Sequence, residues 1–159
     1  MRFRPLWIML LASSFGWSLS VWAGEDEAAV HRTITQAVAG TATFSESRDM
    51  QAVLALYTDD YTGTQDGQPE TKAAIERWLS DYEAELKQGN RLRFIGAVSN
   101  LNTGLEGSTA WAIYDYVFQA IRDGEVEGQD AGRCTSLLRK EQSTWRIFHD
   151  HCSKSTSSR

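Results

Sequence analysis

Two histidines near the C-terminus, His149 and His151, are the residues whose type and spacing best suit chemistry. Side chains alternate between the two faces of a strand, so both histidines fall on the face that also carries Trp145 and Ile147. Two imidazoles in a pocket could transfer protons near neutral pH. The alternative is that they donate hydrogen bonds to neighbouring backbone and support the sheet. The spacing leaves both hypotheses open.

Asp115 is a second candidate for acid–base chemistry, because it lies within the apolar segment 111–118. Burial would raise the pKa of its carboxyl group and suit a general acid or base. Alternation, however, places Asp115 on the same face as Trp111 and Val117, which favours a structural role. The alternative is therefore an ion pair across the sheet with one of three arginines: Arg93, Arg133 or Arg139.

A metal site would need a third ligand beside the His149-x-His151 pair, and neither His31 nor Asp115 has a spacing that supports one. The chain has no nucleophile elbow, no phosphate-binding loop and no zinc-type cysteine cluster. We therefore expect no metal and no cofactor. A formal charge of −5 with scattered basic residues also argues against nucleic-acid binding.

The two cysteines predict a disulfide. Cys134 and Cys152 each lie nine positions from Ser143, within the polar turn 141–144. A simple hairpin would place them opposite each other, and cross-strand partners are close enough for an S–S bond. A β-bulge in either strand would break this register.

The N-terminus has the pattern of a signal peptide over residues 1–23. Arg2 and Arg4 precede an apolar run at 6–11, and Val21 and Ala23 are the small residues expected before cleavage ahead of Gly24. The alternative is an uncleaved anchor, but serines interrupt the run. We predict a periplasmic or secreted protein without a stable membrane anchor, which also suits a disulfide.

The remaining chain predicts helices first and strands afterwards. Helical spacing indicates a helix from residue 25 to about 44, a short helix near 50–57 and a third helix from 71 to 89, with an exposed connection at 59–67. The period then changes to two, and a four-stranded antiparallel meander is expected from 91 to 153. We predict a single α+β domain over residues 24–153, with helices on one face of the sheet and a disordered tail at 154–159.

Several segments resemble one known group of proteins. Residues 48–61, 110–114 and especially 145–153, with the pattern Trp-x-Ile-x-His-x-His-x-Ser, resemble the nuclear transport factor 2-like superfamily. Within it, the chain is most similar to the SnoaL-like branch and to the association domain of calcium/calmodulin-dependent protein kinase II. The resemblance implies a curved antiparallel sheet that holds the N-terminal helices in its concave face, a cone with an open pocket, and inward-facing histidines. It also implies homodimers formed through the outer face of the sheet.

The resemblance implies no single activity, because this fold hosts enzymes, ligand binders and oligomerisation modules. We expect the protein to bind a small, partly apolar molecule. Aromatic side chains and the histidines are the expected lining of the pocket: Tyr61, Trp78, Tyr82, Tyr114, His149 and His151. The alternatives are an isomerase or lyase that uses a pocket carboxylate or histidine, namely Asp115, His149 or His151, and a protein-interaction module.

Overall fold

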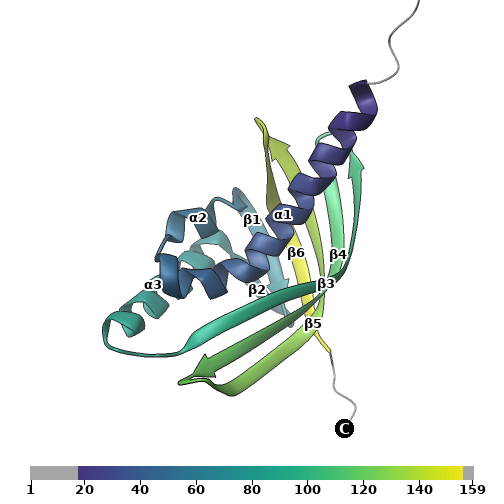
Figure 1. The fold of residues 1–159 in the computed structure, drawn as a ribbon. Coiled ribbons are helices and arrows are strands. Elements are labelled where there is room, and N and C mark those ends of the chain that lie inside the picture. Colours follow the sequence, from purple (N-terminus) through teal and green to yellow (C-terminus); the bar gives the residue numbers. More distant parts are fainter. Residues whose placement is uncertain (1–17, 156–159) are drawn as a thin grey trace, which may run out of the picture.

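A long helix crosses the concave face of a curved sheet in this computed structural model, which describes residues 18–155 without the side chains of residues 18–23 and 41 (Figure 1). Helix α1 (Ser18–Ser47) buries Val30, Ile34 and Phe44, so the predicted amphipathic stripe is the face that packs on the sheet. The predicted signal peptide falls mainly on residues outside the described range. Among the described residues, no helix is long and apolar enough to cross a membrane.

Two shorter helices flank a small hairpin. Helix α2 (Met50–Leu54) is capped by Asp49, whose carboxylate accepts a hydrogen bond from the Ala52 amide. Helix α3 (Lys72–Lys87) is capped in the same way by the Thr71 hydroxyl. Both helices lie at the same end of the sheet (Figure 1).

Most of the segment predicted as an exposed connection, residues 59–67, belongs to a strand, and for that part the prediction was wrong. Strand β1 (Tyr57–Gln65) pairs with β2 (Gln68–Thr71) through a tight turn at Asp66 and Gly67, whose φ angles are 50° and 78°. Strand β1 also pairs in parallel with β6, 80 to 90 residues later in the chain. Such a long-range pairing leaves no local pattern in a polar segment.

The predicted meander is confirmed and forms most of the sheet. It consists of β3 (Arg93–Glu106), β4 (Thr109–Arg122), β5 (Glu125–Glu141) and β6 (Thr144–Lys154). The full sheet has six strands in the order β2-β1-β6-β5-β4-β3, and every pairing except β1–β6 is antiparallel. The expected α+β class, with N-terminal helices on the concave face, is confirmed.

A β-bulge at Phe148 decides the register of the C-terminal hairpin. Near the turn, Leu138 pairs with Ile147, but the next pair along the strands is Leu137 with His149. Without the extra residue, Cys134 would lie opposite His151. With it, Cys134 pairs with Cys152, and the predicted disulfide is confirmed. We expected a bulge to break the pairing of the two cysteines, but here a bulge is needed for it. The turn has two residues, between Glu141 and Thr144, so the hairpin is not centred on Ser143, and the extra residue corrects the register by one position.

The same bulge reverses the faces of the last residues of β6, so the expected inward orientation of the histidines is wrong. Beyond Phe148, Asp150 and Cys152 join the inner face and line a cavity. His151 is exposed on the outer face, and His149 lies beside Thr62 of β1, with 3.4 Å between the imidazole Nδ1 and the threonine hydroxyl. Because of this one extra residue, the Asp150 carboxylate lies on the inner face, and the two imidazoles do not.

Candidate functional site

A cavity of about 440 Å³ lies between the helices and the inner face of the sheet. One part of its wall is apolar and comes from α1, α2, α3, β3 and β4: Ala37, Val38, Val53, Ile75, Trp78, Leu79, Phe94 and Phe118. The other part carries polar groups from five strands: Tyr57, Gln65, Glu70, Tyr114, Tyr116, Asp130 and Asp150. The disulfide also lines this cavity. A volume of this size is within the range of small-molecule sites.

Three side chains at the polar end share hydrogen bonds. The Tyr61 hydroxyl lies 2.8 Å from Asp150 Oδ1 and 3.1 Å from Glu70 Oε2. A phenol has only one proton to donate. For both contacts to be full hydrogen bonds, one of the two carboxyl groups must itself be protonated. The arrangement therefore places one phenol between two acids from different strands, β6 and β2, that can share a proton.

Burial makes both acids weaker than they are in water. Loss of solvation raises the pKa of Asp150 from its ordinary 3.8 to about 6, and the nearby Glu70 carboxylate adds to the rise. The hydrogen bond from Tyr61 and the charges of the adjacent histidines oppose it. Burial likewise raises the pKa of Glu70. An acid that titrates near pH 6 is suited to proton transfer at physiological pH.

Two further tyrosines complete the polar end. The Tyr114 hydroxyl lies 3.2 Å from the Ser136 hydroxyl, and burial raises the pKa of Tyr114 to about 12. Burial and the neighbouring Asp150 carboxylate raise the pKa of Tyr57 well above its usual range. Among the described residues, a hydrogen bond is found to the Tyr57 backbone oxygen and none to its hydroxyl.

Gly63 makes the contact between Tyr61 and Asp150 possible. A Cβ atom at Gly63 would overlap both the Tyr61 hydroxyl and the Asp150 carboxylate. Glycine is therefore required here for close approach rather than for its backbone angle. Gly63 therefore allows the Tyr61 hydroxyl to reach the Asp150 carboxylate.

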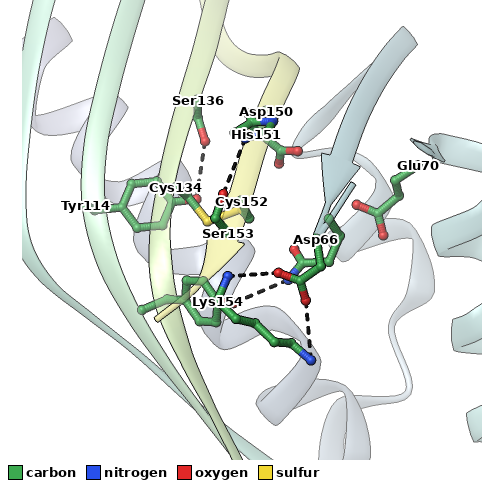
Figure 2. Close-up of a disulfide and its surroundings, with 12 residues drawn as sticks. Asp66, Glu70, Tyr114, Cys134, Ser136, Asp150, His151, Cys152, Ser153 and Lys154 are labelled. Atoms are coloured by element: carbon green, nitrogen blue, oxygen red, sulfur yellow. Dashed lines mark hydrogen bonds and ion pairs between the residues drawn. A yellow bond between two sulfur atoms is a disulfide. The ribbon is translucent and has the colours of Figure 1, made fainter. Parts of the chain in front are cut away.

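Figure 2 shows the disulfide joining β5 to β6, with Asp150 and Glu70 on nearby strands. In the same view, Lys154 contacts Asp66 through both its backbone amide and its ammonium group. The Lys154 ammonium also lies 3.0 Å from Asp130, a residue of the cavity wall. Of the three acids that line the cavity, Asp130 therefore forms an ion pair with a lysine that is not part of the lining.

The structure brings together only part of the predicted ligand site. Trp78 and Tyr114 line the cavity. Tyr61 is not part of the lining, but its hydroxyl forms hydrogen bonds with Asp150 and Glu70, which are. Tyr82 packs behind the wall against Phe94, and its hydroxyl donates to the Leu92 carbonyl. His149 and His151 are not among the lining residues.

The predicted catalytic candidate Asp115 lies on the outer face of the sheet. Its carboxylate accepts hydrogen bonds from Arg133 at 2.7 Å and from Asn100 at 2.7 Å. These two bonds lower the pKa of Asp115. The ion pair with Arg133, one of the three arginines considered from the sequence, is confirmed. His31 donates to or accepts from the Thr103 hydroxyl at 3.0 Å, and no cluster of three potential metal ligands occurs among the described residues.

Sequence reasoning missed Asp150 and Glu70. Asp150 shares its parity in the strand with Cys152, and a core position for the disulfide would have placed it inward. Glu70 lies in a polar segment without a periodic pattern, and no signal in the sequence indicates its burial.

Comparisons with known proteins agree on the fold. A family model described as a SnoaL-like domain matches residues 34–157. No curated protein matches the chain at a significant level. Solved structures that are similar include an NTF2-like protein with a cystatin-like fold from Novosphingobium aromaticivorans, at 19% identity and a TM-score of 0.64, covering 90% of this chain and 94% of that one.

Two further structures are related in fold. A provisionally assigned scytalone dehydratase from Novosphingobium aromaticivorans has 10% identity and a TM-score of 0.67, with coverage of 87% of this chain and 89% of that one. A provisionally assigned calcium/calmodulin-dependent protein kinase II association domain from Xanthomonas campestris has 18% identity and a TM-score of 0.56, with coverage of 83% and 87%. At these identities the likeness establishes the fold alone.

Proposed function

The chain belongs to the SnoaL-like domain family, and we propose that it binds a small, partly apolar molecule in the cavity beneath α1. The observation that carries this proposal is the division of the cavity wall. An apolar part built around Trp78, Phe94 and Phe118 faces a polar part that contains Tyr57, Asp150 and Glu70. Sites for small molecules combine these two features, because apolar walls supply affinity and a few polar groups fix orientation.

Filling the cavity tests this function. Ala37 lines the cavity from α1, and Ala37→Phe would place a ring in the space that a ligand needs. A library of metabolites, assayed by thermal shift and native mass spectrometry, should give ligands for the parent that the variant no longer binds. Ala73→Phe, on the exposed surface of α3, is the matched control and should keep them. Ligands that bind the Ala37→Phe variant as well as the parent would contradict the proposal.

Acid–base catalysis is the second candidate function, and the hydrogen bonds that join Asp150, Tyr61 and Glu70 favour it. An isomerase or lyase needs one group that removes a proton and one that returns it. We assign these two proton-transfer roles to Asp150 and Glu70, because the candidates predicted from the sequence do not line the cavity: Asp115, His149 and His151. At saturating concentrations of the identified ligand, Asp150→Asn should lower any turnover by about a hundredfold or more.

A homodimer through the outer face of the sheet is part of the same proposal. Trp111, Ile113 and Val117 are exposed there by 37–40%, around the Asp115–Arg133 ion pair. An apolar patch on a sheet face is typical of a protein interface, and the rival function of an interaction module would use the same surface. Light scattering should show a dimer that Ile113→Asp converts to a monomer, whereas Val126→Asp, at the exposed end of β5, should remain a dimer.

Export is supported by the leader pattern and by the disulfide. We expect material isolated from the export compartment to begin at Gly24. Intact-mass measurement that finds residues 1–23 retained would contradict cleavage at this position.

A further inference from the structure

We propose that the cavity selects an organic cation, namely an amine with an apolar or aromatic body, and this inference rests on the proposed binding function. The argument starts from the charges of the cavity wall. Three acids line it, and none of the described residues that line it is a lysine, an arginine or a histidine. Lys154 pairs with Asp130, whereas Asp150 and Glu70 have a phenol as their shared partner.

An ionised carboxylate that is buried without a cation is unfavourable, because it loses hydration and gains no opposite charge. The burial that raises the pKa of Asp150 is the same effect. Near neutral pH the Asp150 carboxylate therefore has no cation beside it among the described residues that line the cavity. A bound ammonium group would supply the missing opposite charge, whereas a bound anion would add a further negative charge beside the acids.

Aromatic rings make up much of the remaining wall. The Phe94 and Phe118 rings are stacked with their centroids 5.2 Å apart, and Trp78 lies 5.6 Å from Phe94. Ring faces attract cations as well as apolar groups, most strongly where water is excluded. Buried carboxyl groups at one end and aromatic rings along the wall therefore match the two ends of an arylalkylamine. The Tyr57 hydroxyl is at hand for an additional hydrogen bond.

Three probes of similar size separate charge from shape: 2-phenylethylamine, 2-phenylethanol and 3-phenylpropanoate. Titration calorimetry at pH 7.5 should show the amine binding at least tenfold more tightly than the alcohol, and the carboxylate more weakly than either. Asp150→Asn and Glu70→Gln should each lower the affinity for the amine about tenfold or more and leave that for the alcohol unchanged. Asp115→Asn, on the outer face, is the control and should change neither.

The preference should also fall as the pH is lowered to 5, since protonation removes the charge that attracts the amine. The titratable groups that face Asp150 or influence it are the tyrosines and Glu70 on the inner side and the two histidines on the other side of β6: Tyr57, Tyr61, Glu70, Tyr114, His149 and His151. His149→Gln with His151→Gln should keep a pH dependence, because neither imidazole lines the cavity. Its midpoint should move to higher pH, because the charges of the two histidines lower the pKa of Asp150.

Each alternative result overturns the cation proposal. Equal affinity for amine and alcohol would show binding without charge selection, and the proposed binding function would stand. Tighter binding of 3-phenylpropanoate would reverse the class of ligand. If none of the three probes binds at millimolar concentration, the amine class is excluded, whereas the binding function is decided separately by the library and the Ala37→Phe variant.

Discussion

Replacing Asp150 by asparagine should stabilise the folded protein above pH 7. The variant keeps the size of the side chain and an oxygen that can accept the Tyr61 hydrogen bond, and it removes the charge. In the folded chain Asp150 titrates at a pKa of about 6, compared with 3.8 ordinarily. A shift of this size corresponds to a penalty on the ionised form of about 3 kcal/mol.

The sign of the pH dependence follows from proton binding. Between pH 4 and pH 6 the folded chain holds a proton on Asp150 and the unfolded chain does not, so this group lowers the free energy of unfolding as the pH rises through this window. The penalty is complete above pH 6 and absent below pH 4. Asp150→Asn should therefore raise the free energy of unfolding by up to about 3 kcal/mol at pH 8 and by almost nothing at pH 4.

Urea denaturation at pH 4, 6 and 8, followed by tryptophan fluorescence, measures this difference. Asp115→Asn is the control of opposite sign, because the Arg133 guanidinium lowers the pKa of Asp115 and its carboxylate favours the folded state at pH 8. A gain from Asp150→Asn that is equal at pH 4 and pH 8, or a loss at pH 8, would refute the reasoning. Glu70→Gln should behave like Asp150→Asn, since burial raises the pKa of Glu70 as well.

Three other substitutions test the geometry around the site. Replacing Cys134 and Cys152 together by serine should lower the free energy of unfolding by about 3 kcal/mol and keep the fold, because the bond closes a loop with a sequence separation of 18; urea denaturation measures the loss. Gly63→Ala should separate the tyrosine from the buried acid and lower the affinity for any cavity ligand at least tenfold, as measured by calorimetry. His149→Gln and His151→Gln should leave ligand binding unchanged within a factor of two, because both side chains lie outside the cavity lining.

Controls and contrary results are available for each. Two free thiols in protein from the export compartment would contradict the disulfide. Gly128→Ala is matched to the Gly63 variant, because a Cβ atom there meets nothing within 4 Å, and equal effects of the two would remove the close-approach argument. A His151→Gln variant that melts like the parent and loses its ligand response would contradict the outward placement of this imidazole.

The helices and the four strands of the meander could be predicted from the sequence because their signals are local. Val30, Ile34 and Phe44 repeat at helical spacing and are buried on the sheet, and Asp123-Gly124 predicts a turn that the structure contains between β4 and β5. The family pattern at residues 145–153 predicted the fold as a whole. These features depend on the alternation of side chains within one segment, which a sequence displays directly.

The candidate site could not be predicted in this way, because two non-local events build it. Strand β1 pairs in parallel with β6, which brings Tyr61 and Glu70 to a strand far along the chain. The bulge at Phe148 then turns Asp150 inward and both histidines outward. Whether a strand accommodates an extra residue depends on the register that its neighbours impose and on the curvature of the sheet, and neither is written in the alternation of the strand itself. The sequence by itself therefore determined the helices, the four-stranded meander and the disulfide partners, whereas the tertiary structure decided where β1 pairs and which acid faces the cavity.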